Sequence, residues 1–181
     1  MKLYFIAVVP PEPVRSEVWD MKHYMADHFE TRGALKSPPH ITLQPPFKWE
    51  EAREGELMRA LKTHLETTKP FELNLKGYSC FKPKVIFVDM EESEPLLALQ
   101  AGIKEMVQQD WGIMEERYGD KPFHPHMTIA FKDLRKEMFG LAWDEFKEKM
   151  YDRLIEIGSV CLLKHDGKKW HIAREIPFGT L

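Results

Sequence analysis

The sequence predicts an α+β fold of two pseudo-symmetric lobes, each an antiparallel sheet with helices on its outer face, with an active-site cleft between them. One reason is that the order strand, helix, strand, helix, strand occurs twice within the 181 residues. Another is that each copy contains the segment Pro-His-apolar-Thr-apolar once. No linker rich in Gly or Ser separates the copies, which favours a single bilobal domain over residues 1–181. We expect approximate lobes of residues 1–80 and 81–181, with strand exchange between them allowed.

The first copy begins with residues 3–9, which are apolar on both faces and end at a Pro-Pro pair, as a buried strand does. Apolar residues spaced three and four apart predict amphipathic helices over residues 13–30 and 51–68. Between these helices, a loop leads to a short strand around residues 41–43. Residues 71–76 alternate between apolar and polar side chains, which is the period of a half-buried strand.

The second copy repeats this order. The expected elements are a strand at 85–89, a helix at 96–106, a loop at 112–125, a strand at 126–131, a helix at 134–150 and strands at 154–163 and 170–176. The helix at 134–150 has an apolar stripe of Leu134, Met138, Leu141, Phe146 and Met150. The last two strands are joined across a two-residue turn of Asp166 and Gly167.

Composition and charge exclude several classes of protein. With 43% apolar and 30% charged residues, the chain is ordinary for a globular protein and unlike a disordered, collagenous or membrane-bundle sequence. The net charge of −3 provides no overall cationic field for non-specific binding of long nucleic acids. Cys80 and Cys161 have no CxxC partner, which argues against a disulfide scaffold or a structural zinc site and predicts buried, small apolar side chains.

The start of the chain and its apolar stretches bear on its location. One basic residue and a seven-residue apolar run lack the longer apolar region and the small-residue cleavage site of a signal peptide. No stretch approaches the roughly 18–20 apolar residues of a membrane span. We therefore expect a cytoplasmic protein with no membrane partner.

The repeated segment reads Pro39-His40-Ile41-Thr42-Leu43 in the first copy and Pro125-His126-Met127-Thr128-Ile129 in the second. Side chains alternate between the two faces of a strand, so each histidine shares a face with the threonine two residues later. A single His-x-Thr is weak evidence, because a histidine on a strand is commonly structural. Two copies in the same context, 86 residues apart, indicate a functional pair facing a shared cleft.

Two imidazoles and two hydroxyls suit acid–base chemistry on a phosphate. An imidazole has an ordinary pKa of about 6.5, so one histidine can act as general base and the other as general acid near neutral pH. Threonine hydroxyls and a protonated histidine can stabilise the charge on the non-bridging phosphate oxygens. This chemistry needs no metal and no cofactor.

These residues resemble those of the 2H phosphoesterase superfamily, and within it the 2′-5′ RNA ligase and cyclic phosphodiesterase-like proteins. The resemblance covers essentially the whole chain. Besides the paired segments, it includes the strand that opens the chain and runs to Glu12, Phe81 ahead of residues 85–87, and Phe123-His124 before the second motif. The two motifs are its specific part.

The resemblance implies a bilobal fold and metal-independent cleavage of 2′,3′-cyclic or related cyclic nucleotide phosphodiesters, or ligation of RNA ends through 2′-5′ bonds. Its implied catalytic residues are His40 and His126, and its implied phosphate-binding residues are Thr42 and Thr128. It leaves open which histidine is the base. The expected partners are RNA termini or small cyclic nucleotides, and the expected state is a monomer.

Several other side chains are candidates for substrate contact, although a purely structural role would also explain the presence of each of them. The aromatic and imidazole candidates are Tyr4, whose strand face is open, Phe47 and Phe131, for which the core is the favoured place, and His124, which Pro125 separates from His126. The cationic candidates, for which solvated charge is the default explanation, are Lys84, Lys132 and Arg135.

Two alternatives belong to other functional classes. A zinc-dependent hydrolase would use His40, His124 and His126 as ligands, but it leaves the threonines without a role and has no acidic residue near either motif to orient the ligands. A non-catalytic RNA- or nucleotide-binding module would keep the same cleft without turnover.

Charge is distributed unevenly along the chain. Residues 31–49, around the first motif, carry three basic residues and no acidic one, a formal charge of +3. Residues 121–136, around the second motif, also carry +3, while the chain as a whole carries −3. The motif-bearing segments can attract a phosphate while the acidic remainder disfavours long RNA, which favours short or terminal phosphodiesters.

Overall fold

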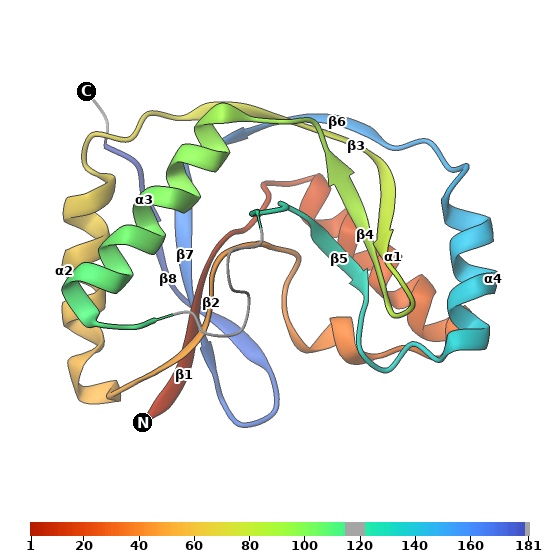
Figure 1. Cartoon of the computed structure of the whole chain (residues 1–181), viewed down its shortest axis with the longest axis horizontal. Coiled ribbons are helices and arrows are strands. Elements are labelled where there is room, and N and C mark those ends of the chain that lie inside the picture. Colours follow the sequence, from red (N-terminus) through yellow and green to blue (C-terminus); the bar gives the residue numbers. More distant parts are fainter. Residues whose placement is uncertain (115–121, 180–181) are drawn as a thin grey trace.

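The structure, a computed structural model, describes residues 1–114 and 122–179. Its two four-stranded sheets contain only antiparallel neighbours (Figure 1). The first sheet, in the order β2-β1-β7-β8, comprises β1 (Lys2–Val8), β2 (Ile41–Trp49), β7 (Ser159–His165) and β8 (Trp170–Pro177). The second sheet, in the order β5-β4-β3-β6, comprises β3 (Phe71–Phe81), β4 (Val85–Met90), β5 (Met127–Ala130) and β6 (Asp152–Ile157). The predicted α+β class with two antiparallel sheets is confirmed.

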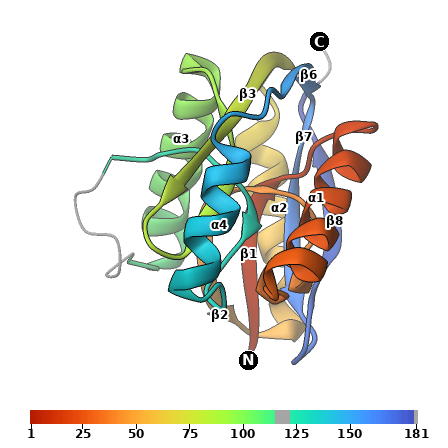
Figure 2. The same ribbon diagram turned by 90° about the vertical axis from the view of Figure 1, so that its right-hand side faces the viewer.

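Helices cover the outer side of each sheet. The helices are α1 (Val14–Phe29), α2 (Glu54–Leu65), α3 (Glu94–Trp111) and α4 (Lys136–Phe146), with short 3₁₀ helices η1 (Gly33–Lys36) and η2 (Glu51–Arg53). α2 packs on β8 and α3 on β2, whereas α1 packs on β5 and on α4. Figure 1 shows α2 and α3 on one side of the molecule and α1 and α4 on the other, and Figure 2 shows α1 and α4 in front with α2 and α3 behind. α1 therefore leaves the first sheet to cover the second, and α3 does the reverse.

The sheets do not follow the two halves of the chain. β3 belongs to the second sheet, and β7 and β8 return to the first, which is the strand exchange that the sequence analysis allowed for. The single strand predicted at residues 154–163 is wrong, because the chain passes from β6 to β7 at Gly158 and thereby changes sheets. β1 and β7 lie at the centre of the first sheet, between β2 and β8, and their side chains are buried on both faces.

Local sequence explains the packing of α2 and the two ends of α3. The Leu57, Leu61 and Leu65 stripe of α2 is fully buried, as its spacing of four predicts. α3 starts at Ser93, whose hydroxyl accepts the Leu96 N–H, and ends at Gly112, whose φ of +64° closes the helix. Much of the loop predicted at residues 112–125, including Lys121, lies outside the described residues.

The predicted helix over residues 134–150 is shorter, and two of its stripe residues are not in the core. α4 ends at Phe146, and Leu141 and Met150 are 62% and 95% exposed. The buried side of α4 consists of Phe139, Ala142 and Phe146, because the helix packs against α1 and its Phe146 ring meets that of Tyr78 on β3, with ring centres 5.0 Å apart.

The alternation of β1 separates the core from the space between the sheets. Tyr4, Ile6 and Val8 join the large core formed with the helices. Phe5 and Ala7 point the other way and pack in a smaller cluster that includes Leu163 and Trp170. In the described part of the chain, no helix has both the length and the apolar character needed to cross a bilayer.

The burial of the α2 stripe leads to a stability prediction. Leu61→Ala removes a fully buried side chain and leaves a cavity, so the free energy of unfolding should fall by about 2–5 kcal/mol. Leu141→Ala makes the same chemical change on an exposed helix position and should alter it by no more than about 0.5 kcal/mol. Urea denaturation followed by circular dichroism measures both. Equal losses in the two variants would contradict the packing described for α2.

Candidate active site

A cavity of about 680 Å³ lies between the two sheets and brings both repeated segments together. The first sheet contributes Phe5 of β1 and Thr42 of β2 to its wall, and the second contributes Phe81 of β3 and Thr128 of β5. His40 and His126, which immediately precede β2 and β5, also line it. The four residues that the sequence singles out therefore share one cavity.

The first motif is held by β1 and by its own preceding residues. Thr42 pairs with Ala7 in the β1–β2 ladder, so it lies on the cavity face of the first sheet. The His40 ring packs against Phe5 with their ring centres 4.8 Å apart. Its Nδ1 lies 2.7 Å from the carbonyl oxygen of Pro38. A carbonyl can only accept a hydrogen bond, so Nδ1 carries the proton and Nε2 is left as the basic nitrogen.

The second motif repeats this local geometry. His126 Nδ1 lies 2.7 Å from the carbonyl oxygen of His124, again two residues earlier in the chain. Thr128 pairs with Phe87 across the β4–β5 ladder. The His126 ring centre lies 5.0 Å from that of Phe81 and 5.1 Å from that of Phe87. Both histidines thus have the same tautomer and an aromatic neighbour.

The surroundings of the two histidines keep both rings neutral at pH 7. Burial, with a smaller effect from the positive charge of Lys22, lowers the pKa of His40 to about 3. Burial also lowers the pKa of His126, although its bond to the His124 carbonyl and the charge of Asp89 oppose the shift. The shift is larger for His40, so the two imidazoles are not equivalent.

Lys22 is a cavity residue that the sequence analysis did not single out. It is only 1% exposed, and its Nζ donates hydrogen bonds to the carbonyl oxygens of Ala34, at 3.0 Å, and Ser37, at 2.9 Å. Burial lowers its pKa to about 7. The signal for it was present in the sequence, because Lys22 lies four residues after Val18 and three before Met25, within the apolar stripe of α1.

Aromatic side chains beyond the predicted ones also line the cavity. Phe5 and Trp170 lie on the first sheet, with their ring centres 4.6 Å apart in an edge-on contact. Phe81 and Phe123 line the opposite side. Of the predicted substrate contacts, His124 and Phe131 are part of the wall.

Two of the predicted substrate contacts, Tyr4 and Phe47, do not line the cavity. Tyr4 is fully buried and its hydroxyl donates to Glu54 at 2.9 Å, on the face of β1 opposite to the cavity. Phe47 is 5% exposed and packs between Tyr4 and Trp111, with ring centres 6.3 Å and 5.8 Å away. A strand that is apolar on both faces gives no sign of which face meets the cavity, and here that face carries Phe5.

The predicted cationic contacts lie outside the cavity wall. Lys84 is exposed in the turn between β3 and β4. Lys132 has its Nζ 5.6 Å from the ring centre of Phe131, and Arg135 forms an ion pair with Glu30. A role for these three residues in substrate contact stays a prediction, limited to parts of a substrate that extend beyond the cavity.

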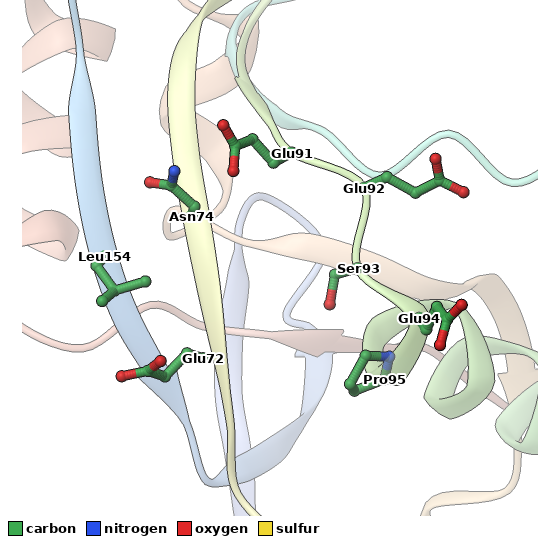
Figure 3. A pocket seen from close by; sticks show the side chains of 8 residues that line it. All are labelled: Glu72, Asn74, Glu91, Glu92, Ser93, Glu94, Pro95 and Leu154. Atoms are coloured by element: carbon green, nitrogen blue, oxygen red, sulfur yellow. The ribbon is translucent and has the colours of Figure 1, made fainter.

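Among the described residues, no side-chain cluster suits a metal ion, and a second, smaller cavity does not suit a phosphate. Within residues 1–114 and 122–179, no three His, Cys, Asp or Glu side chains gather to hold a metal ion, so the zinc alternative has no geometric support. A smaller cavity of about 350 Å³, shown in Figure 3, is lined by Glu72, Glu91, Glu92 and Glu94 beside Asn74 and Leu154. Its carboxylates repel a phosphate.

Fold and site together define a class, the 2H phosphoesterases, in which two His-x-Thr segments face one cleft. The chain belongs to the 2′-5′ RNA ligase superfamily, whose family model matches residues 10–169.

Curated relatives and solved structures agree with this membership. A provisionally assigned phosphoesterase of Bacillus pumilus is 31% identical over 97 residues, 52% of this chain and 53% of that relative. Another, from Oceanobacillus iheyensis, is 28% identical over 139 residues, 76% of this chain and 74% of that relative. The alignment thus spans about half the length of the first relative and three quarters of the second.

Two solved structures share the fold. The protein TT0787 of Thermus thermophilus has a TM-score of 0.69 at 21% identity, covering 100% of both chains. LigT of Escherichia coli, solved in complex with 3′-AMP, has a TM-score of 0.69 at 15% identity, covering 99% of both chains. At these identities, the likeness concerns the fold.

The low pKa of His40 predicts acid sensitivity of the fold. Between its folded value of about 3 and the ordinary value of 6.5, the unfolded chain binds a proton that the folded protein does not. The free energy of unfolding therefore falls as the pH falls below about 6.5, by up to about 1.4 kcal/mol per pH unit from this group. His40→Asn lacks this contribution, so urea titrations between about pH 6 and pH 4 should show a shallower slope. Equal slopes in the two proteins would rule out the buried neutral state of His40.

Proposed function

We propose that this protein hydrolyses 2′,3′-cyclic phosphates or related cyclic nucleotide phosphodiesters and is able to ligate RNA ends through 2′-5′ bonds. The observation that carries the proposal is the pair of histidines on one cavity, each with Nδ1 bound to a backbone carbonyl and Nε2 left free for proton transfer. A half-buried threonine accompanies each histidine in the same wall. Membership of the family supports phosphoesterase chemistry at this site.

In the proposed reaction, two protons move in opposite directions. Nε2 of one histidine takes a proton from water while the water oxygen bonds to phosphorus. The bond between phosphorus and one ribose oxygen breaks, and Nε2 of the other histidine gives that oxygen a proton. Thr42 and Thr128 donate hydrogen bonds to the non-bridging oxygens, whose negative charge grows in the transition state. With the 5′-hydroxyl of a second RNA end in place of water, the same ring-opening step, in the same direction, joins the two ends: the bond between phosphorus and the 3′ oxygen breaks and a 2′-5′ phosphodiester remains.

The charges around each ring favour His40 as the base and His126 as the acid in hydrolysis. His40 lies near the Lys22 amine, which disfavours a second positive charge. His126 lies near Asp89, whose carboxylate favours the protonated imidazole. Both rings are neutral without substrate, and the bound phosphate anion raises the pKa of the acid so that it takes up its proton.

The cavity supports a small nucleotide or an RNA terminus as substrate. Its volume of about 680 Å³ is that of a site for one small organic ligand, and Phe5, Phe81 and Trp170 offer faces on which a base can stack. The Escherichia coli relative binds a nucleotide, 3′-AMP, on the same fold. A cytoplasmic location and a monomeric state remain predictions from the sequence.

Substitution of either histidine tests the two-histidine mechanism. His40→Asn and His126→Asn should each lower kcat/KM for 2′,3′-cyclic nucleotides by about 10²–10⁴-fold, because asparagine keeps much of the shape and cannot transfer the proton. Tyr4→Phe, on the opposite face of β1, is the control and should retain the activity. Product formation is followed by chromatography with a chelator present. Full activity in either histidine variant would refute the mechanism, and loss with the chelator would favour the zinc hydrolase.

The two threonines allow a matched pair of substitutions. Thr42→Val and Thr128→Val remove the hydroxyl at constant shape and should lower kcat by about 10²–10³-fold if each donates to the developing charge. Thr42→Ser and Thr128→Ser keep the hydroxyl and should stay within about tenfold of the parent protein. Steady-state kinetics on the same cyclic nucleotide separates the two pairs. Similar losses for Val and Ser would mean that packing of the methyl group, rather than the hydroxyl, matters. Binding of the nucleotide without turnover in the parent protein would instead indicate a binding module.

A further inference from the structure

The segment that leads into the first motif is held from two sides. It begins with η1, which follows α1, and continues through Ser37, Pro38 and Pro39 to His40. On one side, the carboxylate of Asp133 accepts hydrogen bonds from Thr31 Oγ1 at 2.7 Å and from the backbone N–H of Arg32 at 2.8 Å and of Gly33 at 3.0 Å.

Glycine at position 33 allows the backbone of this segment to lie close to Asp133. A Cβ at this position would lie 2.8 Å from both Asp133 Oδ1 and the Phe131 carbonyl oxygen, closer than any real side chain tolerates. The start of the segment is therefore pressed against the residues that follow the second motif. This contact connects the segment before the first motif with the second sheet.

On the other side, Lys22 holds the end of the segment. Its Nζ donates to the carbonyl oxygens of Ala34 and Ser37, and the aliphatic part of its side chain lies within the buried stripe of α1. Pro38 and Pro39 lack an N–H, so this stretch cannot anchor itself by donating backbone hydrogen bonds. The bonds from Lys22 supply an anchor at the residue just before the two prolines.

A chain of contacts connects Lys22 with the His40 ring. The Ser37 carbonyl belongs to the peptide bond with Pro38, and the Pro38 carbonyl accepts the hydrogen bond from His40 Nδ1 at 2.7 Å. Movement of the Ser37 carbonyl would therefore carry the Pro38 carbonyl with it. Among the residues that the structure describes, no lysine makes a comparable bond to the carbonyls before His126.

We propose that Lys22 is a positioning residue for His40, because its hydrogen bonds to Ala34 and Ser37 fix the peptide groups that orient the imidazole. The inference rests on the proposed function only in treating His40 as a catalytic group. Lys22 holds the Pro38 carbonyl where it binds Nδ1–H, so Nε2 stays the basic nitrogen and faces the cavity. Within residues 1–114 and 122–179, the first motif thus has a support that the second lacks, which makes the two motifs functionally unequal.

The charge of Lys22 favours the neutral form of His40, and thus supports the same state of the ring as its hydrogen bonds do. The titratable groups that act on His40 are Lys22, from α1, and His126, from the second sheet. Both oppose protonation of His40, as burial does. A neutral His40 keeps Nε2 free as an acceptor.

Lys22→Met tests the proposal, since methionine fills a similar volume without hydrogen bonds or charge. The expected result is a kcat about 10–100-fold lower with KM within about threefold, because misplacement of a catalytic group slows the chemical step. In ¹⁵N spectra of the imidazoles, the hydrogen-bonded Nδ1–H signal of His40 should weaken or the second tautomer should appear, while the signals of His126 stay unchanged. Asp27→Asn, which breaks only the exposed 3.9 Å ion pair between α1 and Arg32, is the control and should change neither readout.

Other results would overturn the proposal. A higher KM at unchanged kcat would mean that Lys22 binds substrate directly, and an unchanged His40 spectrum would mean that Lys22 does not orient the ring. If Lys22→Met does not fold, Lys22→Gln, whose side chain is one atom shorter than that of lysine and carries no charge, takes its place and must likewise perturb the His40 signal, because its amide does not reproduce both hydrogen bonds of Lys22 Nζ. An unperturbed signal there also overturns the proposal. The spectra require no turnover, so a parent protein that is inactive on cyclic nucleotides refutes the proposed function while still testing Lys22.

Discussion

The site depends on one hydrogen bond that occurs twice. In each lobe, a histidine Nδ1 lies 2.7 Å from the carbonyl oxygen two residues earlier, with a proline between them. The proline restricts the backbone and the carbonyl can only accept, so the unit selects one tautomer and one ring orientation. A strand that starts at the next residue then places the threonine on the same face. Orientation of the reactive nitrogen is thus a local property of the sequence Pro-His-x-Thr.

Bringing the two units together is a long-range property of the fold. β1 is buried on both faces and lies between β2 and β7, so Phe5 and Ala7 face the cavity while Tyr4 and Ile6 face the helices. The exchange of α1 and α3 between the sheets ties the lobes to each other (Figure 1). Asp133 adds a direct link, since its carboxylate binds backbone about 100 residues earlier in the chain.

The parts of this arrangement that follow local rules could be predicted from the sequence. Alternation placed His40 with Thr42 and His126 with Thr128, and the spacing of leucines located α2. The sequence leaves Tyr4 as a candidate for substrate contact, because a strand apolar on both faces carries no information about which face meets a cavity. The change of sheet at Gly158 and the contact between Asp133 and Gly33 depend on partners far away in sequence. Lys22 is not recognised from the sequence, because the buried stripe of a helix is identified by its apolar residues. A lysine within such a stripe is nevertheless an informative exception to the pattern.

The electrostatics of the cavity determine what it can recognise. Burial lowers the pKa of both His40 and His126 and lowers that of Lys22 to about 7, so the two imidazoles add no positive charge to the cavity at pH 7, although the motif-bearing segments around it are basic. A phosphate that enters supplies the negative charge that favours a protonated imidazole, so binding and activation of the acid are one event. A ligand without that charge leaves both rings neutral and gains no such stabilisation. The preference for a phosphodiester that we propose therefore follows from the same burial that lowers the pKa of both histidines.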